Sequence, residues 1–289
     1  MPVVDTASVA WWIWPIALFA ASFLLGIVAV VSGIGGGVLF VPVVGGFFPF
    51  HLDFVRGAGL LLALSGTLAA GPVLLRSGMA NLRLMMPLAL AGSMASFAGA
   101  LLGLSLPTDL LQIALGATVI AVALVLWRAT QIDHLGATES DPLGAMLRLR
   151  GEFDDPAAGA RIDWRTHQTP GGLAVFALIG FLGGVFGLGA GFANVPALNL
   201  LMAAPLKLAV GSSGLIISVI NSSAAWVYIN SGAVLPLLVV PSILGVMLGS
   251  RIGARLLRVA PAATVRRLVI AVMLVAGARA LLRGMGIWN

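Results

Sequence analysis

Long apolar segments alternate with short polar breaks along most of the chain. A helix needs roughly 20 apolar residues to cross a bilayer, and most of these segments reach that length. The pattern predicts ten apolar elements, at residues 11–31, 38–50, 57–75, 84–104, 108–128, 171–190, 191–204, 209–229, 234–254 and 265–283. The elements at 38–50 and 191–204 are short and contain proline, so their length leaves open whether they span the membrane or are half-helices.

The stretch at 129–170 differs from the rest, because seven of the ten acidic residues of the chain fall in it. It therefore resembles a solvated linker, in which we expect a short surface helix around 142–150. The linker divides the chain into a first membrane repeat at 11–128 and a second membrane repeat at 171–284.

The two repeats share a glycine-rich motif. The sequence GIGGGVLFVP at Gly33–Pro42 returns as GLGAGFANVP at Gly187–Pro196, an offset of 154 residues. The offset then holds for other residues that shape the backbone, since Gly57 maps to Gly211, Pro87 to Pro241 and Ser96 to Ser250. A shared apolar bias would not keep such residues in one register, so the chain contains two copies of one unit.

Composition places these segments in a membrane. The chain has 289 residues, of which 60% are hydrophobic and 9% are charged, whereas a soluble domain carries roughly 25% charged residues. The fold class predicted is therefore an all-α, polytopic membrane protein. The chain has no cysteine, which excludes disulfides, thiolate chemistry and cysteine metal sites.

Basic loops predict the orientation of the two repeats, because such loops face the cytoplasm. In repeat 1 the loop after the third element carries Arg76 and Arg83, and in repeat 2 the basic loop follows the fourth element. This exchange predicts two inverted copies. With the N-terminus outside and the linker cytoplasmic, thirteen of the sixteen basic residues lie inside. The opposing interpretation, a parallel repeat with a re-entrant short element, would place the basic cluster of repeat 2 outside.

Inverted repeats with interrupted helices are typical of secondary transporters, which bind substrate near the bilayer midplane. Glycines permit close backbone approach, prolines free backbone carbonyls, and a helix that begins after such a loop directs N–H groups at an anion. Hydroxyl and amide side chains suit the same ligand. The substrate-binding residues predicted are Gly33, Gly35, Gly36, Gly37, Pro42, Arg56, Thr67, Gly187, Gly189, Gly191, Asn194, Pro196, Ser212, Ser213 and Asn221.

Each of these residues also has a purely structural interpretation. Glycines spaced four apart, as in Gly33 and Gly37, pack helices closely in lipid, and hydroxyl or amide side chains form hydrogen bonds between helices. Arg56 at a membrane boundary could extend its side chain to the interface. The predicted spans hold no clear Asp, Glu or His at mid-depth, so a proton relay, a carboxylate sodium site and an intramembrane enzyme are not expected. We also expect no metal and no cofactor.

At this point the sequence resembles the sulfite exporter TauE/SafE family. The resemblance is carried by the repeated motif and by the closing segment SRIGARLLRVAPAATVRRLVIAVMLVAGARALL, from Ser250 to Leu282. It implies a multi-pass inner-membrane transporter of sulfite, thiosulfate, sulfoacetate or related organosulfonates, with export as the usual direction. Members of this family are usually assigned seven or eight helices, so some of the ten elements would be half-helices. The second motif departs from the first at Ala190, where repeat 1 has Gly36.

The leading hypothesis is therefore alternating access of two inverted repeats around the paired motifs. The alternative is a flippase for a polyprenyl phosphate or another anionic lipid carrier, which broken helices and arginine-rich boundaries also fit. The partners expected are a small sulfur oxyanion or organosulfonate and the lipid bilayer, without nucleic acid, and a homodimer stays open.

Overall fold

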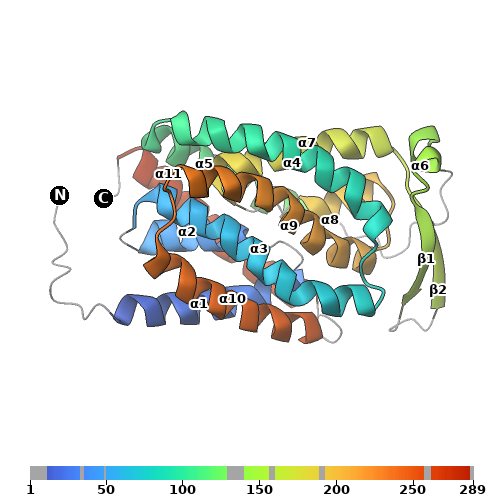
Figure 1. The fold of residues 1–289 in the computed structure, drawn as a ribbon, viewed down its shortest axis with the longest axis horizontal. Coiled ribbons are helices and arrows are strands. Elements are labelled where there is room, and N and C mark those ends of the chain that lie inside the picture. Colours follow the sequence, from blue (N-terminus) through green and yellow to red (C-terminus); the bar gives the residue numbers. More distant parts are fainter. Residues whose placement is uncertain are drawn as a thin grey trace.

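The structure is a computed structural model that describes residues 12–32, 36–48, 50–128, 140–155, 160–188, 193–256 and 262–286. Within these residues the helices lie side by side in one bundle, with a small hairpin at one end (Figure 1). The helices of repeat 1 are α1 (Ile13–Ser32), α2 (Gly36–Phe47), α3 (Leu52–Arg76), α4 (Leu82–Ser105) and α5 (Thr108–Arg128). Those of repeat 2 are α7 (Thr169–Phe186), α8 (Asn194–Pro196), the π-helix η1 (Ala197–Leu201), α9 (Leu206–Asn230), α10 (Pro236–Leu256) and α11 (Ala262–Gly284).

Each predicted apolar element contains one of these helices. Among the described residues, six helices are long and apolar enough to cross a membrane, namely α1, α3, α4, α7, α9 and α10. The short elements do not reach that length. Helix α2 has 12 residues, which at about 1.5 Å per residue is roughly 18 Å against a hydrocarbon core of about 30 Å. Helix α8 and η1 are shorter still, so both short elements are half-helices.

The motif prolines act differently in the two repeats. Pro42 lies inside α2, which continues past it, so the proline does not end the helix in repeat 1. Pro196 is the last residue of α8, and the next five residues form the π-helix η1. A proline has no N–H to donate to the helix, and a wider π turn is a known adjustment to an interrupted hydrogen-bond ladder.

The linker corrects the all-α prediction. It holds the expected surface helix, α6 (Pro142–Met146), but it also forms a two-stranded antiparallel hairpin of β1 (Arg150–Asp155) and β2 (Ala160–Arg165). The hydrophobic period that identifies the membrane helices does not exist in a polar segment, so the sequence pattern gave no signal for these strands. The fold is mostly helical, with this hairpin standing at the end of the bundle where α3 joins α4 (Figure 1).

Asp141 fastens the linker to the membrane helices. One carboxylate oxygen accepts a hydrogen bond from the Gly144 N–H at 3.2 Å and so caps α6. The other accepts from the Thr169 hydroxyl at 2.7 Å and from the Thr169 N–H at 3.2 Å. Because Thr169 is the first residue of α7, this single side chain, 28 residues before Thr169, joins α6 to α7.

Replacing Asp141 with alanine is expected to lower the free energy of unfolding by about 1 kcal/mol, the usual cost of losing an N-cap. Partial burial raises the pKa of Asp141, but the hydrogen bonds from Thr169 and Gly144 outweigh it and hold the pKa below its ordinary value of 3.8. The ionised Asp141 carboxylate therefore stabilises the fold above pH 4, and this stabilisation is lost as the pH falls through its folded-state pKa. Thermal unfolding in detergent at pH 7 and pH 3 measures it. A change as large in Asp163→Ala, an exposed carboxylate on β2, would show that the cap is not the cause.

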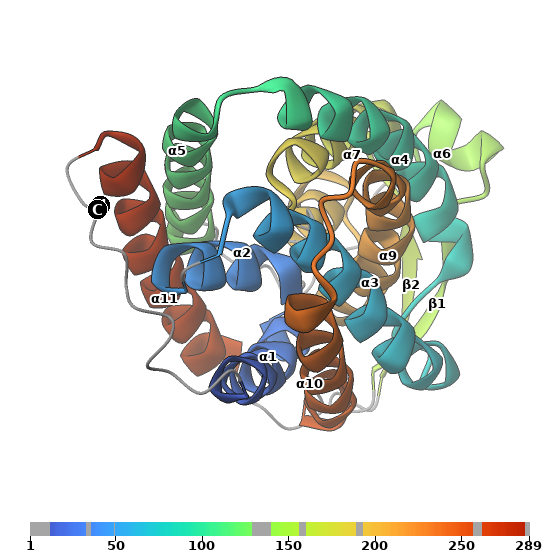
Figure 2. The same cartoon turned by 60° about the vertical axis from the view of Figure 1, so that its left-hand side comes forward.

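Helices of one repeat pack mainly on helices of the other. The packing is symmetric: when each helix is replaced by its counterpart in the other repeat, the same set of packed pairs results. Helix α1 packs on α10 and α7 packs on α4, while α3 packs on α9 and α5 packs on α11. The pair α5 and α11 forms one flank of the bundle, opposite α4, α7 and α9 (Figure 2). Individual contacts follow the same exchange. A Cβ on Gly57 would overlap the Ala233 carbonyl oxygen, and a Cβ on Gly211 would overlap that of Met79, and these pairs differ by 154 residues throughout.

Contacts along the helices give their directions. Gly57 in the first turns of α3 faces Ala233, just after α9, whereas Gly71 near the end of α3 faces Leu215 in the first half of α9. Helices α3 and α9 therefore run antiparallel, although they occupy corresponding places in the two repeats. Helices α5 and α11 also run antiparallel, because Gly284 faces Ile113 and Gly277 faces Ile120.

Candidate functional site

The two glycine motifs meet against α3. A Cβ on Gly37 would lie 2.8 Å from the carbonyl oxygens of both Gly59 and Leu188. A Cβ on Gly59 would lie 2.8 Å from the Gly187 carbonyl oxygen. Only glycine permits backbones to approach this closely. Gly37 and Gly187 therefore have the structural role of allowing close packing, which was the interpretation set against substrate binding. This packing brings the two motifs into one place.

The described part of the chain covers only some of the motif residues. Gly33, Gly35, Gly189 and Gly191 lie outside the described residues, and Gly36 is the first residue of α2. The N-terminus of α2 thus lies in the first motif, beside Gly37 and its contact with Leu188. Helix α2 points the positive end of its dipole and its free N–H groups toward this meeting point.

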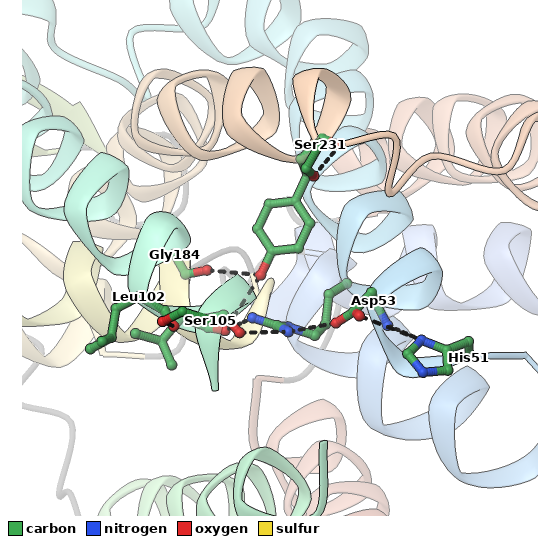
Figure 3. A network of polar contacts seen from close by, with 10 residues as sticks. His51, Asp53, Leu102, Ser105, Gly184 and Ser231 are labelled. Carbon is green, nitrogen blue, oxygen red and sulfur yellow. Dashed lines mark hydrogen bonds and ion pairs between the residues drawn. The ribbon is translucent and has the colours of Figure 1, made fainter. Parts of the chain in front are cut away.

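Arg56 is the buried charge nearest to the meeting point, and only 1% of it is exposed. Its Nη1 donates to Asp53 Oδ1 at 2.9 Å and to the Gly103 carbonyl at 3.3 Å, and its Nη2 donates to the Val185 carbonyl. Its guanidinium carbon lies 5.1 Å from the centre of the Tyr228 ring. Figure 3 shows this network, which extends on one side to Asp53 and His51.

The partners of Arg56 explain how a cation is accommodated there. Gly103 lies in the last turn of α4, and Val185 lies in the last turn of α7. The last four carbonyls of a helix lack partners within it and carry the negative end of the helix dipole. The Tyr228 hydroxyl donates to the same helix end, at 3.3 Å to the Gly184 carbonyl. Asp53 supplies the formal negative charge, so Arg56 is neutralised without reaching the interface.

The structural interpretation of Arg56 expected its side chain to extend to the membrane interface. The side chain is instead buried inside the protein. It joins repeat 1 to repeat 2, because Val185 and Tyr228 belong to repeat 2. The network continues outward from Asp53, which is 35% exposed, to His51, whose Nδ1 lies 3.5 Å from the other Asp53 carboxylate oxygen. A backbone contact also fixes Arg56 to the second motif, since a Cβ on Gly187 would lie 2.6 Å from the Arg56 Cβ.

Two asparagine side chains stand out among the predicted site residues. Asn194, at the start of α8, and Asn221, in the middle of α9, are both 0% exposed. The amide nitrogen and oxygen of each have no hydrogen-bond partner among the described residues. Buried polar groups are almost always paired, and an unpaired one costs about 1–3 kcal/mol. The described part of the chain therefore leaves the donors and acceptors of both amides unused.

The other predicted hydroxyl residues have partners within the chain. The Thr67 hydroxyl donates to the Ala63 carbonyl at 2.8 Å. The Ser212 hydroxyl accepts from the Asn81 N–H at 3.1 Å and so supports the loop between α3 and α4. Ser213 is fully buried and also has a partner. These three residues show the role in hydrogen bonding within the chain that was the alternative to substrate contact.

Sequence reasoning missed two contributors to the buried network. Tyr228 is the only tyrosine of the chain, and a lone tyrosine deep in an apolar segment was a usable signal, because a buried hydroxyl needs a partner. Asp53 lies three residues before Arg56, a spacing at which charged side chains meet on a helix. That pair could also have been found from the sequence.

The fold and the buried residues define the class of protein. Six candidate spans among the described residues, with buried polar side chains such as Arg56, Asn194 and Asn221 within the bundle, describe a multi-pass membrane protein. The family model described as "Sulfite exporter TauE/SafE" matches residues 18–280. The chain belongs to the TauE/SafE family of membrane transporters and is not an enzyme.

One curated relative supports the same assignment. The chain is 31% identical over 119 residues to the "Probable membrane transporter protein YunE" of Bacillus subtilis (strain 168). The matched stretch covers 41% of this chain and 44% of the relative, so the similarity spans less than half the length of either protein. No solved structure matches the chain significantly.

Proposed function

We propose that the protein is a secondary transporter that exports a small sulfur-containing anion, such as sulfite, thiosulfate, sulfoacetate or another organosulfonate. The family supports a sulfur anion as substrate. The observation that carries the proposal is the pair of buried, unpartnered amides of Asn194 and Asn221. Their N–H groups would donate to the oxygens of a bound oxyanion and so acquire the partners that the chain itself does not supply.

Neutral donors suit an anion that has to be released. An amide N–H and the N-terminus of α2 at Gly36 attract negative charge without forming an ion pair. Transport requires binding that is strong enough for entry and weak enough for departure on the other side. Export of an anion is further assisted by the membrane potential, by roughly 2.3 kcal/mol per charge for each 100 mV.

We further propose that residues 11–128 and 171–284 are inverted repeats joined by a cytoplasmic linker at 129–170, with the N-terminus outside. The antiparallel courses of α3 and α9, and of α5 and α11, support inversion, since these helices occupy corresponding places in the two repeats. The basic loop of Arg76 and Arg83 lies at the same end of the bundle as the linker hairpin, as this topology requires (Figure 1). The homodimer stays a prediction.

In this proposal the two repeats rock against each other and Arg56 holds them together at the external end. Its hydrogen bond to the Val185 carbonyl and its contact with Tyr228 both cross from one repeat to the other. The residue that corresponds to Arg56 in repeat 2 is Val210. The cytoplasmic end therefore lacks this clamp, and opening there does not require a buried ion pair to break.

Replacing Asn194 or Asn221 with leucine is expected to abolish transport and to leave the protein as stable as before. Leucine has the same number of side-chain heavy atoms as asparagine and the same branching at Cγ, and removing an unpartnered polar group from a buried position is neutral or favourable for folding. Transport is measured as efflux of radiolabelled sulfite and of labelled sulfoacetate from proteoliposomes, at both polarities of the membrane potential. Stability is measured as the thermal unfolding of the same preparations.

Asn199→Leu is the matched control. Asn199 is also buried, but its amide donates to the Ala204 carbonyl at 2.9 Å, so this substitution should destabilise the protein. Wild-type rates of sulfur-anion efflux in both Asn194→Leu and Asn221→Leu would reject the amides as the binding groups. Absence of flux for every tested anion in the wild-type protein would reject the transport proposal itself.

A further inference from the structure

A pocket at the linker end of the bundle carries two arginines from separate parts of the chain. It is lined by the α3–α4 loop with the first residues of α4, including Asn81, Leu82 and Arg83, and by Arg150 and Gly151 of β1. It contains no acidic residue among its lining residues. The pocket lies far from the motif site, because α3 ends and α4 begins there, and the site described above is at the other end of α3.

The hairpin register adds a second observation that points to an anion. Arg150 on β1 lies directly opposite Arg165 on β2. Like charges in directly opposed positions destabilise a hairpin. Of the neighbouring carboxylates on this face, Glu152 is paired with Arg161 at 2.9 Å, and Asp163, opposite Glu152 in the register, forms no ion pair among the described residues. Among the residues described, neither Arg150 nor Arg165 nor Arg83 has an ion-pair partner. An anion bound in the pocket beside Arg150 would offset the repulsion between Arg150 and Arg165.

The exposed face of α4 indicates what kind of anion fits. One apolar stripe runs along α4, because exposed apolar side chains recur there every four residues. They are Leu82, Met86, Leu90 and Met94. Helix α4 is one of the candidate membrane spans, and this stripe therefore faces lipid. It begins at the pocket, because Leu82 both starts the stripe and lines the pocket. A ligand with an acidic headgroup and apolar chains matches a basic pocket that is followed by an apolar stripe.

We propose that this pocket binds the headgroup of an anionic phospholipid, with the phosphate between Arg83 and Arg150 and the acyl chains along the α4 stripe. Basic pockets beside membrane helices are a known form of lipid headgroup site. Arg83 lies on a helix of repeat 1 and Arg150 lies in the linker. The bound lipid therefore fastens the linker hairpin to the membrane surface and fixes its position relative to α4.

The test is a titration of the delipidated, full-length protein with phosphatidylglycerol, followed by native mass spectrometry and thermal unfolding. Phosphatidylcholine and soluble glycerol phosphate are titrated in parallel. The double variant R83Q/R150Q is expected to weaken phosphatidylglycerol binding roughly tenfold or more, because each arginine near a membrane surface contributes measurably to the attraction of anionic lipid. The matched control is R128Q/R251Q, which removes the same charge from exposed positions on α5 and α10.

The expected result is a rise in melting temperature with phosphatidylglycerol that R83Q/R150Q loses and R128Q/R251Q retains. Equal binding of phosphatidylcholine would overturn the proposal, because the headgroup charge would then be irrelevant. An equal rise with glycerol phosphate would identify a soluble anion as the ligand and would overturn the lipid assignment. An equal loss in R128Q/R251Q would attribute binding to net charge and remove the pocket from the explanation.

Discussion

Replacing Arg56 with alanine is expected to lower the free energy of unfolding by about 3–5 kcal/mol, because two hydrogen bonds from a charged donor to buried carbonyls are lost, each worth about 1.5–3 kcal/mol. The variant leaves the Gly103 and Val185 carbonyls at two buried helix ends without their donor. It also removes the cation over the Tyr228 ring. Thermal unfolding of the purified protein in detergent measures the loss.

Two further variants separate the causes. Arg56→Lys keeps the charge but replaces a planar fork by a single ammonium, which cannot reach Asp53, Gly103 and Val185 together, so an intermediate loss is expected. Arg251→Ala removes an exposed arginine on α10 and should change stability by no more than about 0.5 kcal/mol. If Arg56→Ala unfolds at the same temperature as Arg251→Ala, the buried network does not hold the two repeats together.

The helices were the most predictable part of this fold, for a physical reason. In lipid every backbone N–H and C=O has to be paired within the segment, so a long apolar run leaves few alternatives to a helix. The regular offset between the motifs added the correspondence of α3 with α9, which begin and end 154 residues apart. The polar linker has no such constraint, and its hairpin of β1 and β2 could not be inferred from apolar periodicity.

The burial of Arg56 shows where reasoning from the sequence stops. Hydropathy assigns an arginine at the end of a span to the interface, because a lone charge in hydrocarbon is costly. The cost is met here by Asp53, three residues earlier on the same helix, and by two groups that are distant in sequence, namely the end of α4 and the end of α7. The ends of α4 and α7, which pack on each other, reach Arg56 only in the folded chain, and no residue near Arg56 in the sequence indicates these two carbonyls.

The candidate site was predicted in part. Asn194 was selected because it stands in the second motif, and Asn221 because it is an amide within an apolar helix. Their lack of partners could not be foreseen, since it depends on which neighbours surround each amide. Thr67 illustrates the contrast. It corresponds to Asn221 in the other repeat, yet its hydroxyl is satisfied by the Ala63 carbonyl one helical turn earlier, an option that any helical threonine has.

Replacing Gly187 with alanine is expected to lower the free energy of unfolding by roughly 2–5 kcal/mol, from two separate causes. Gly187 ends α7 in the left-handed conformation, with φ of +66°, and a Cβ costs about 1–2 kcal/mol there. That Cβ would also lie 2.7 Å from the Arg56 carbonyl oxygen, and crowding of this kind costs about 1–3 kcal/mol. Thermal unfolding measures the sum, and sulfite efflux reports whether the motif site is disturbed.

Gly232→Ala separates the two causes, because Gly232 has nearly the same backbone angle, with φ of +72°, and no atom within 4 Å of the position a Cβ would take. It should show the conformational cost alone and retain transport. The excess loss in Gly187→Ala then measures how tightly the second motif is held against α3. Equal losses in the two variants would mean that Gly187 is not tightly packed against the Arg56 backbone. The Arg56 backbone would then be free to move away from the motif, and a rigid contact between the motifs and α3 could not be part of the transport cycle.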